Sequence, residues 1–343
     1  MFSIDLPFGI SIDFSFWNTL LNLPSDQFIN AIFAMVGCSN SQSSKSNDAA
    51  STPTATSTAS NTTTVLPRDG APDPATWDSV PIEPAKIFDN LYYVGSKYIG
   101  AWVLNTSEGI ILIDSMNNSD DAQKVIVPGI KELGFDPAKI KYVLVTHGHG
   151  DHYGGAKYIQ DTFGATVLMS SIDGDFMTKN YKDRIAAEKA GKDTSKLPPN
   201  PDIPTSYTNI SDGQKLTLGD ATITVVYTPG HTPGSVSLII PVTDNGTNHT
   251  TSIWGGTGVP KSLEDNQKYE SSVDYFNKFA YEAKVDSELS SHPFVDNAVE
   301  RMDTLSKRKT GDQNPFVIGQ EGYKAYMAKM KEYATNNINK LTK

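Results

Sequence analysis

The sequence predicts an α/β fold for residues 77–343, and three observations support it. Strand and helix signals alternate from Trp77 onward. Apolar runs of strand length are bounded by turn residues, and the longer segments carry helix start and stop residues. No low-complexity stretch interrupts these segments after Trp77. A chain of 343 residues has room for one large domain or two ordinary ones, and the unbroken pattern favours one.

The expected elements fall into two halves. The first half predicts strands at 91–95, 100–104 and 109–113, a helix over 119–134 interrupted by Pro128, a strand at 141–146, a helix at 155–163 and a strand at 166–170. The second half predicts strands near 214–218, 221–227, 235–240 and 251–254, followed by a helix around 265–283. A three- to four-residue spacing predicts a last helix whose core-facing stripe is Tyr323, Met327, Met330, Tyr333 and Ala334.

Residues 171–206 form a long, polar, proline-rich insert between the two halves. Long irregular segments near active sites are often functional. We therefore expect this insert to form one wall or lid of a substrate cleft, with a solvated surface excursion as the alternative.

Five of the six histidines fall into one pattern. Three lie in THGHGDHYGG together with Asp151, one lies in TPGHTPGS and one in SSHPF; they are His147, His149, His152, His231 and His292. Imidazole is the commonest zinc ligand, binding at about 2.0 to 2.1 Å. His249, in the polar loop DNGTNHTT, stays outside the pattern.

The spacing of the cluster predicts two metal ions. His147 and His149 are two residues apart after the apolar run YVLV, so in an extended segment they point the same way and can share one ion. Gly148 and Gly150 allow the backbone to tighten, which turns Asp151 and His152 toward a second ion. The two distant histidines would each complete a set of three ligands, leaving a position for water as in catalytic zinc sites. A lone histidine is more often a core or surface residue, so the cluster carries this prediction.

These motifs resemble the metallo-β-lactamase superfamily, and most of all the third subclass of class B β-lactamases. The resemblance covers about residues 77–335 and includes NLYYVGS, GIILIDS, THGHGDHYGG, PGHTPGS and the late SHP. It implies a four-layer αββα sandwich with a dinuclear metal site at the edge of its two sheets. Two zinc ions per subunit are implied, the first held by His147, His149 and His231 and the second by Asp151, His152 and His292.

Other branches of the superfamily differ at recognisable positions. Glyoxalase II, the acyl-homoserine lactonases and the persulfide dioxygenases usually place a metal-binding Asp where this chain reads SIWGGTG. The first β-lactamase subclass uses a cysteine ligand, but Cys38 lies outside the catalytic region. Flavodiiron proteins replace the second motif histidine with Glu, whereas this chain keeps His149. The resemblance therefore makes His292 the sixth ligand.

The substrate pocket departs from the subclass pattern. The strand aligned with SIWGGTGVP normally supplies serine hydroxyls that hold the substrate carboxylate, but here the positions are Gly256, Thr257 and Val259. Thr257 can donate a hydrogen bond and Val259 cannot, so anchoring of an anionic β-lactam is weakened. We expect substrate contacts from Thr257, Tyr153 and Trp254. Asp114, at the end of the IILID run, is expected to orient a metal ligand.

The expected function is that of a dinuclear zinc hydrolase. Zinc lowers the pKa of bound water to about 7, so a metal-bound hydroxide would attack a lactam-type carbonyl, with Asp151 and His152 as catalytic residues. The alternatives are a lactonase, a thioesterase or another ester hydrolase. Outside the hydrolases, the chain would be an exported zinc-binding protein without catalysis, or an iron oxidoreductase on the same scaffold.

Charge and composition restrict the partners. The net charge of −10 and the pI near 5.1 disfavour nucleic acid, whose backbone requires basic contacts. The expected partner is a small-molecule lactam, lactone or ester.

The amino-terminal part predicts no catalytic structure. Residues 1–38 are an apolar segment and a candidate targeting region, residues 39–76 a Ser/Thr-rich flexible linker, and residues 77–343 the catalytic domain. Pro24 and Asp26 divide the apolar segment into pieces too short for a membrane span, which needs roughly 18 residues. No basic residue precedes Lys45, so a secretory signal would be atypical. The stretch MVGC resembles a lipobox, but an ordinary thiol at Cys38 is favoured over a lipid anchor.

Export is favoured by the glycosylation sequons. Six Asn-x-Ser/Thr motifs begin at Asn61, Asn105, Asn117, Asn209, Asn245 and Asn248. Together with the Ser/Thr-rich stretch, they indicate an exported glycoprotein from a eukaryote. The single cysteine argues against a disulfide framework but not against export.

Overall fold

The computed structural model describes residues 3–6, 10–13, 65–68, 72, 79–194 and 201–343. The chain divides into two compact units, Met1–Ser60 and Asn61–Lys343. In the first unit, β1 (Ser3–Leu6) pairs antiparallel with β2 (Ile10–Asp13). The linker stretch 39–64, the Cys38 thiol and the Asn61 sequon lie outside the described residues.

Residues 65–68, part of the expected linker, belong to the second unit and contact its later segments. The Arg68 N–H donates to the Val295 carbonyl at 2.9 Å, and the Tyr333 hydroxyl donates to the Pro67 carbonyl at 2.7 Å. The described contacts of the second unit therefore begin before Trp77. No helix among the described residues has the length and apolar character needed to cross a bilayer.

The second unit contains a seven-stranded mixed sheet whose strands are neighbours in sequence order. The first four strands run antiparallel, and the pairs from β6 to β9 are parallel. The strands are β3 (Ala85–Lys86), β4 (Leu91–Gly95), β5 (Gly100–Thr106), β6 (Gly109–Ile113), β7 (Ile140–Leu144), β8 (Thr166–Met169) and β9 (Thr208–Asn209).

A five-stranded mixed sheet faces the first one. Its first four strands are antiparallel, and the last pair is parallel. The strands are β10 (Lys215–Leu218), β11 (Ala221–Tyr227), β12 (Val236–Asp244), β13 (Thr247–Ile253) and β14 (Ser287–Leu289).

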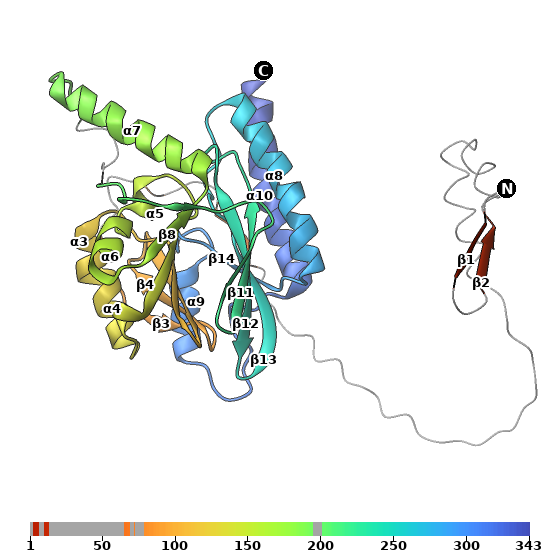
Figure 1. The fold of residues 1–343 in the computed structure, drawn as a ribbon. Coiled ribbons are helices and arrows are strands. Elements are labelled where there is room, and N and C mark those ends of the chain that lie inside the picture. Colours follow the sequence, from red (N-terminus) through yellow and green to blue (C-terminus); the bar gives the residue numbers. More distant parts are fainter. Residues whose placement is uncertain (1–2, 7–9, 14–64, 69–71, 73–78, 195–200) are drawn as a thin grey trace, which may run out of the picture. The chain divides into compact units, whose positions relative to one another are not determined.

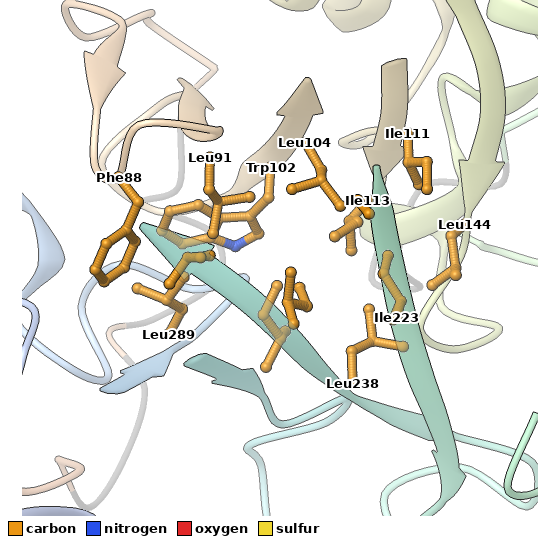
Figure 2. Close-up of a cluster of buried hydrophobic side chains, with 14 of the residues drawn as sticks. Phe88, Leu91, Trp102, Leu104, Ile111, Ile113, Leu144, Ile223, Leu238 and Leu289 are labelled. Carbon is orange, nitrogen blue, oxygen red and sulfur yellow. The ribbon is translucent and has the colours of Figure 1, made fainter. Parts of the chain in front are cut away.

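The main core lies between the two sheets (Figure 2). In β5, Trp102 and Leu104 belong to this core, whereas Val103 belongs to the cluster on the outer face. This is the two-residue period of a strand whose two faces are both buried. From the opposite sheet, Ile223 and Leu238 complete the packing.

Helices cover both outer faces, so the layers follow the order α-β-β-α (Figure 1). The seven-stranded sheet packs against the π-helix η3 (Ala122–Ile126), α4 (Val127–Glu132) and α6 (Ala156–Phe163), and the short α3 (Ser119–Asp121) directly precedes η3. The five-stranded sheet packs against α8 (Leu263–Glu282) and α10 (Gly319–Leu341). The sandwich implied by the sequence resemblance is confirmed.

Pro128 widens a helix instead of ending it. The π-helical turn η3 precedes it, and α4 begins with Pro128 in its first turn. Proline has no N–H to donate and its ring clashes with a regular preceding turn, and a π segment relieves this clash by enlarging the turn. The other helices of the described residues are the 3₁₀-helix η4 (Pro137–Lys139), α5 (Gly150–Tyr153), α7 (Ser171–Lys189) and α9 (Ala298–Ser306).

The prediction of an irregular insert was wrong for residues 171–189. They form α7, which extends away from the body of the unit (Figure 1). Its exposed part is supported by charge pairs four residues apart, including Lys179–Asp183 at 2.5 Å and Arg184–Glu188 at 2.6 Å. Because this helix lacks a continuous apolar stripe, hydrophobic periodicity could not reveal it.

The loop predicted around His249 is instead a β-hairpin. Strands β12 and β13 extend to a tight turn at Asn245 and Gly246, whose φ values are 49° and 79°. His249 lies within β13, and its Nδ1 is 2.7 Å from the Asp286 carboxylate. Its place outside the histidine cluster agrees with the sequence interpretation.

Candidate metal centre

Six side chains of types that can bind a metal converge from segments that follow three strands. His147 and His149 come after β7, and the one-turn helix α5 then carries Asp151 and His152. His231 follows β11 and His292 follows β14, so both come from the five-stranded sheet. Each sheet therefore contributes to the same cluster.

The six side chains form two groups of three. His147, His149 and His231 make one group, and Asp151, His152 and His292 make the other; within each group one ligand atom per residue lies within 4.8 Å of the others. In the first group, His231 Nε2 is 3.1 Å from His149 Nδ1. In the second, the Nε2 atoms of His152 and His292 are each 3.6 Å from Asp151 Oδ2. This is the partition that the sequence resemblance implies.

Two buried nitrogen atoms without hydrogen-bond partners in the described part of the chain indicate that these residues can bind metal ions. The Nε2 atoms of His147 and His152, one in each group, are buried and have no hydrogen-bond partner among the described residues. A buried polar atom left unpaired costs about 1 to 3 kcal/mol, and a metal ion would satisfy each of these two. Imidazole nitrogen with one carboxylate is a donor set that suits zinc. The residues present therefore fit a dinuclear metal site.

Four of the histidines are held in the neutral form. Burial lowers the pKa of His149 to about 4 and that of His231 to about 3, and it lowers the pKa values of His147 and His292 in the same direction. Neighbouring histidines add to the effect because two imidazolium charges would repel each other. Neutral imidazole is the form that binds a metal.

Asp151 and His152 are shifted toward their charged forms. Burial opposes the charge of Asp151, but His152, His292 and His149 lower its pKa to about 2. Burial likewise opposes the charge of His152, yet the carboxylates of Asp151 and Asp114 raise its pKa. Asp151 is therefore an ionised carboxylate at neutral pH.

Asp114 connects three segments of the centre. Its carboxylate is fully buried and accepts hydrogen bonds from the Thr146 N–H at 2.8 Å and from the Ser291 hydroxyl at 2.7 Å. Asp114 Oδ2 also lies 2.8 Å from His152 Nδ1. The residue adopts φ 60°, which is unusual for a non-glycine residue and often found at functional sites. This geometry suits the ligand-orienting role expected from the sequence.

Backbone carbonyls orient two further candidate ligands. His231 Nδ1 is 2.6 Å from the Gly258 carbonyl, and His292 Nδ1 is 3.0 Å from the Tyr98 carbonyl. A carbonyl only accepts, so both Nδ1 atoms carry protons and leave Nε2 available. The sequence interpretation missed these contacts because a carbonyl is present at every position and has no residue signature.

Two of the expected substrate contacts are core residues. Tyr153 is 3% exposed and packs beneath the seven-stranded sheet, where burial raises its pKa to about 12. Trp254 is 2% exposed and packs against Tyr269 and Phe276. We correct both assignments, because a side chain enclosed by the core has no surface to offer a substrate.

The turn after β13 accommodates the ring of His231. A Cβ atom at Gly256 would lie 2.6 Å from three atoms of the His231 side chain, so only glycine fits at this position. The Trp254 indole N–H donates to the Gly256 carbonyl at 2.7 Å and fixes the turn. Thr257 is half-buried at the same turn, and its substrate contact stays a prediction.

The chain is similar in sequence and in fold to known proteins. The family model described as the metallo-beta-lactamase superfamily matches residues 98–244, which include five of the six clustered side chains. The crystal structure of BJP-1, a subclass B3 metallo-beta-lactamase of Bradyrhizobium japonicum, aligns at 28% identity and a TM-score of 0.62, covering 77% of this chain and 96% of that one. The chain belongs to the metallo-β-lactamase superfamily.

Two further known proteins are also similar to this chain. The native FEZ-1 metallo-beta-lactamase from Legionella gormanii has 24% identity and a TM-score of 0.64, covering 78% of this chain and 99% of that one, and shows the shared fold. N-acyl homoserine lactonase AttM of Rhizobium radiobacter is 32% identical over 122 residues, which are 35% of this chain and 43% of the lactonase. The similarity thus spans less than half of that curated relative.

Proposed function

We propose that this metallo-β-lactamase superfamily member is a dinuclear zinc hydrolase that opens a lactam-type carbonyl. The observation that carries the proposal is the pair of three-residue groups, each with a buried Nε2 atom that a metal would satisfy. Two bound zinc ions would supply hydroxide at neutral pH and polarise the substrate carbonyl.

The exposure of the side chains indicates where a substrate approaches. His147 and His152 are buried, whereas His149, His231 and His292 are half-buried. The Asp151 side chain is 25% exposed, and its low pKa keeps it ionised. Asp151 can therefore accept a hydrogen bond from a water molecule at the open edge and orient it toward the carbonyl carbon. A protein supplying three ligands per ion leaves a position for substrate or water.

A lactam is supported by the likeness to a subclass B3 β-lactamase over most of the chain. A lactone is the second candidate, and the turn after β13 favours it. Val259 packs against the cluster under α8 and α10, so it offers no polar group to a substrate carboxylate. Thr257 is then the hydroxyl left at this turn to bind such a group, and a neutral lactone does not need that anchor.

The experiment is an assay of zinc-loaded protein against β-lactams, neutral lactones and thioesters. The matched variants are His292→Ala, which removes a proposed ligand, and His249→Ala, which removes a histidine outside both groups. Turnover of any class that is lost in the first variant and kept in the second supports a hydrolase. Two bound zinc ions without turnover across the panel would instead support a zinc-binding protein, and bound iron with oxygen consumption would support an oxidoreductase.

Export and glycosylation are part of the same proposal. Asn209, Asn245 and Asn248 are exposed, which suits glycan attachment. The Asn117 amide donates to the Asp121 carboxylate at 2.8 Å, so a glycan there would break that contact. Secretion from a eukaryotic host, followed by glycosidase treatment, should reduce the apparent mass of the wild type by more than that of a variant with Gln in place of Asn209, Asn245 and Asn248.

A further inference from the structure

Asp173 lies in the first turn of α7 and is 1% exposed, although the metal centre described above does not include it. Its carboxylate contacts two loops that are far apart in the sequence. One loop carries His147 and His149, and the other begins with His231. These three histidines make up the first metal group.

The two carboxylate oxygens accept three hydrogen bonds from the two loops, and Oδ2 alone joins one loop to the other. Asp173 Oδ2 accepts from the Gly148 N–H at 2.7 Å and from the Thr232 hydroxyl at 2.6 Å. Oδ1 accepts from the Gly234 N–H at 2.7 Å. Gly148 separates the two ligands of one loop, and Thr232 directly follows the ligand of the other. The carboxylate therefore fixes the distance between the loops.

The helix start is packed tightly against both loops. A Cβ atom at Gly148 would lie 2.8 Å from the Asp173 carbonyl, and one at Gly234 would lie 2.4 Å from the Ser170 hydroxyl. Ser170 caps α7 by accepting from the Asp173 N–H at 3.1 Å, and it donates to the Gly234 carbonyl at 2.6 Å. One turn later, the Phe176 ring lies 5.8 Å from the His149 ring, centroid to centroid.

We propose that Asp173 is a positioning residue that sets the spacing between the His147–His149 loop and His231, and thereby the affinity and geometry of the first metal site. The proposal rests on the proposed function, because it presupposes that this group binds zinc. Asp173 contacts no substrate; it acts through the backbone that holds the ligands. The turn of helix that the sequence interpretation placed in an irregular insert is then part of the metal centre.

The test uses Asp173→Asn, because an amide has one accepting oxygen in place of two, so the hydrogen bonds from Gly148, Thr232 and Gly234 cannot all be kept. Asp175→Asn is the matched control, since Asp175 is exposed on the same helix and the change in charge is the same. Both substitutions are made in the His292→Ala protein, in which the first group is the intact one. Zinc affinity is measured by competition with a chromophoric chelator, and ligand geometry from the absorption bands of cobalt(II).

We expect Asp173→Asn to weaken zinc binding about tenfold and to shift the cobalt bands, and Asp175→Asn to change neither. Equal zinc affinity and an unchanged cobalt spectrum would overturn the proposal, even if the melting temperature of the metal-free protein fell. If Asp173→Asn does not fold, Thr232→Val removes one of the three hydrogen bonds and should weaken binding in the same direction; unchanged affinity there would also overturn it. Failure of the unsubstituted chain to bind zinc would refute the metal site itself, and the role of Asp173 with it.

Discussion

His152 donates a hydrogen bond from Nδ1 to the buried carboxylate of Asp114 across 2.8 Å. The proton is thus fixed on Nδ1, and Nε2 is directed toward Asp151 and His292. The same carboxylate accepts from Ser291, the residue directly before His292. Asp114 therefore orients His152 directly, and it holds His292 through the hydrogen bond to the preceding Ser291.

Replacing Asp114 should weaken the second metal site. In Asp114→Asn, the side-chain amide can donate to His152 Nδ1, which favours the tautomer that carries its proton on Nε2. Because Nε2 is the proposed metal-binding atom, we expect zinc affinity at this site to fall about 10- to 100-fold. Isothermal titration of the metal-free protein would measure this. Asp120→Asn, on the exposed surface, should behave as the wild type; retention of both affinities in Asp114→Asn would contradict the proposed role.

Removing one histidine from either group should remove one zinc ion. His231→Ala and His292→Ala each leave two protein ligands in one group, so we expect zinc content to drop from two ions to about one per chain. Elemental analysis after gel filtration measures the content directly. His249→Ala should keep both ions, and a loss of zinc in that variant would show that the metal is held elsewhere.

Gly256 should tolerate no side chain. A methyl group there would come within 2.6 Å of His231, and this ring must move if the glycine becomes alanine. We expect Gly256→Ala to lose the first metal site while the fold remains, as judged by zinc content and circular dichroism. Gly258→Ala provides a graded comparison, because its Cβ atom would lie 3.3 Å from the same ring and should cost less affinity. Equal zinc binding in both variants would argue against this packing.

Acid should destabilise the metal-free protein. The pKa of His149 is about 4 and that of His231 about 3 in the fold, against an ordinary 6.5. Between these values the unfolded chain binds more protons, so stability falls as pH falls through this window, by about 2 kcal/mol from His149 alone near pH 5. His152 has a raised pKa and acts in the opposite direction, while Asp151 titrates below the window.

Denaturant unfolding of chelator-treated protein at about pH 7.5 and pH 5 would measure this change. A His149→Gln, His231→Gln protein serves as the comparison because glutamine does not titrate. Its stability should depend less on pH across the same range. An equally steep dependence in that protein would place the responsible groups elsewhere.

The sequence predicted much of the framework because the relevant signals are local. Alternating apolar runs identified β11 with its observed bounds, and most of the other strands to within a few residues. The arrangement of the sheets into a sandwich, and the pairing of His292 with Asp151, depend on contacts across the fold and entered only through the family resemblance. The Asn245-Gly246 dipeptide is a local signal for a β-hairpin. The residues around this dipeptide are polar, and for this reason the segment was interpreted as a loop.

What could not be predicted depends on partners distant in the chain. Asp173 is one carboxylate among many on a polar segment, and its role follows only from its contact with Gly148 and Gly234. Tyr153 and Trp254 lie next to glycines in the motifs, yet local sequence does not tell which face of the backbone meets the core. Burial in the assembled fold decides whether such an aromatic ring reaches solvent.

Each metal group takes its ligands from both sheets of the sandwich, and this makes the centre a cross-link between the two halves of the unit. A bound ion would connect the end of β7 to the end of β11 in one group, and to the end of β14 in the other. Since metal binds only when both sheets are in place, its binding free energy adds to the stability of their packing. Depletion of zinc would then weaken the packing of the two sheets against each other, in addition to abolishing the proposed hydrolysis.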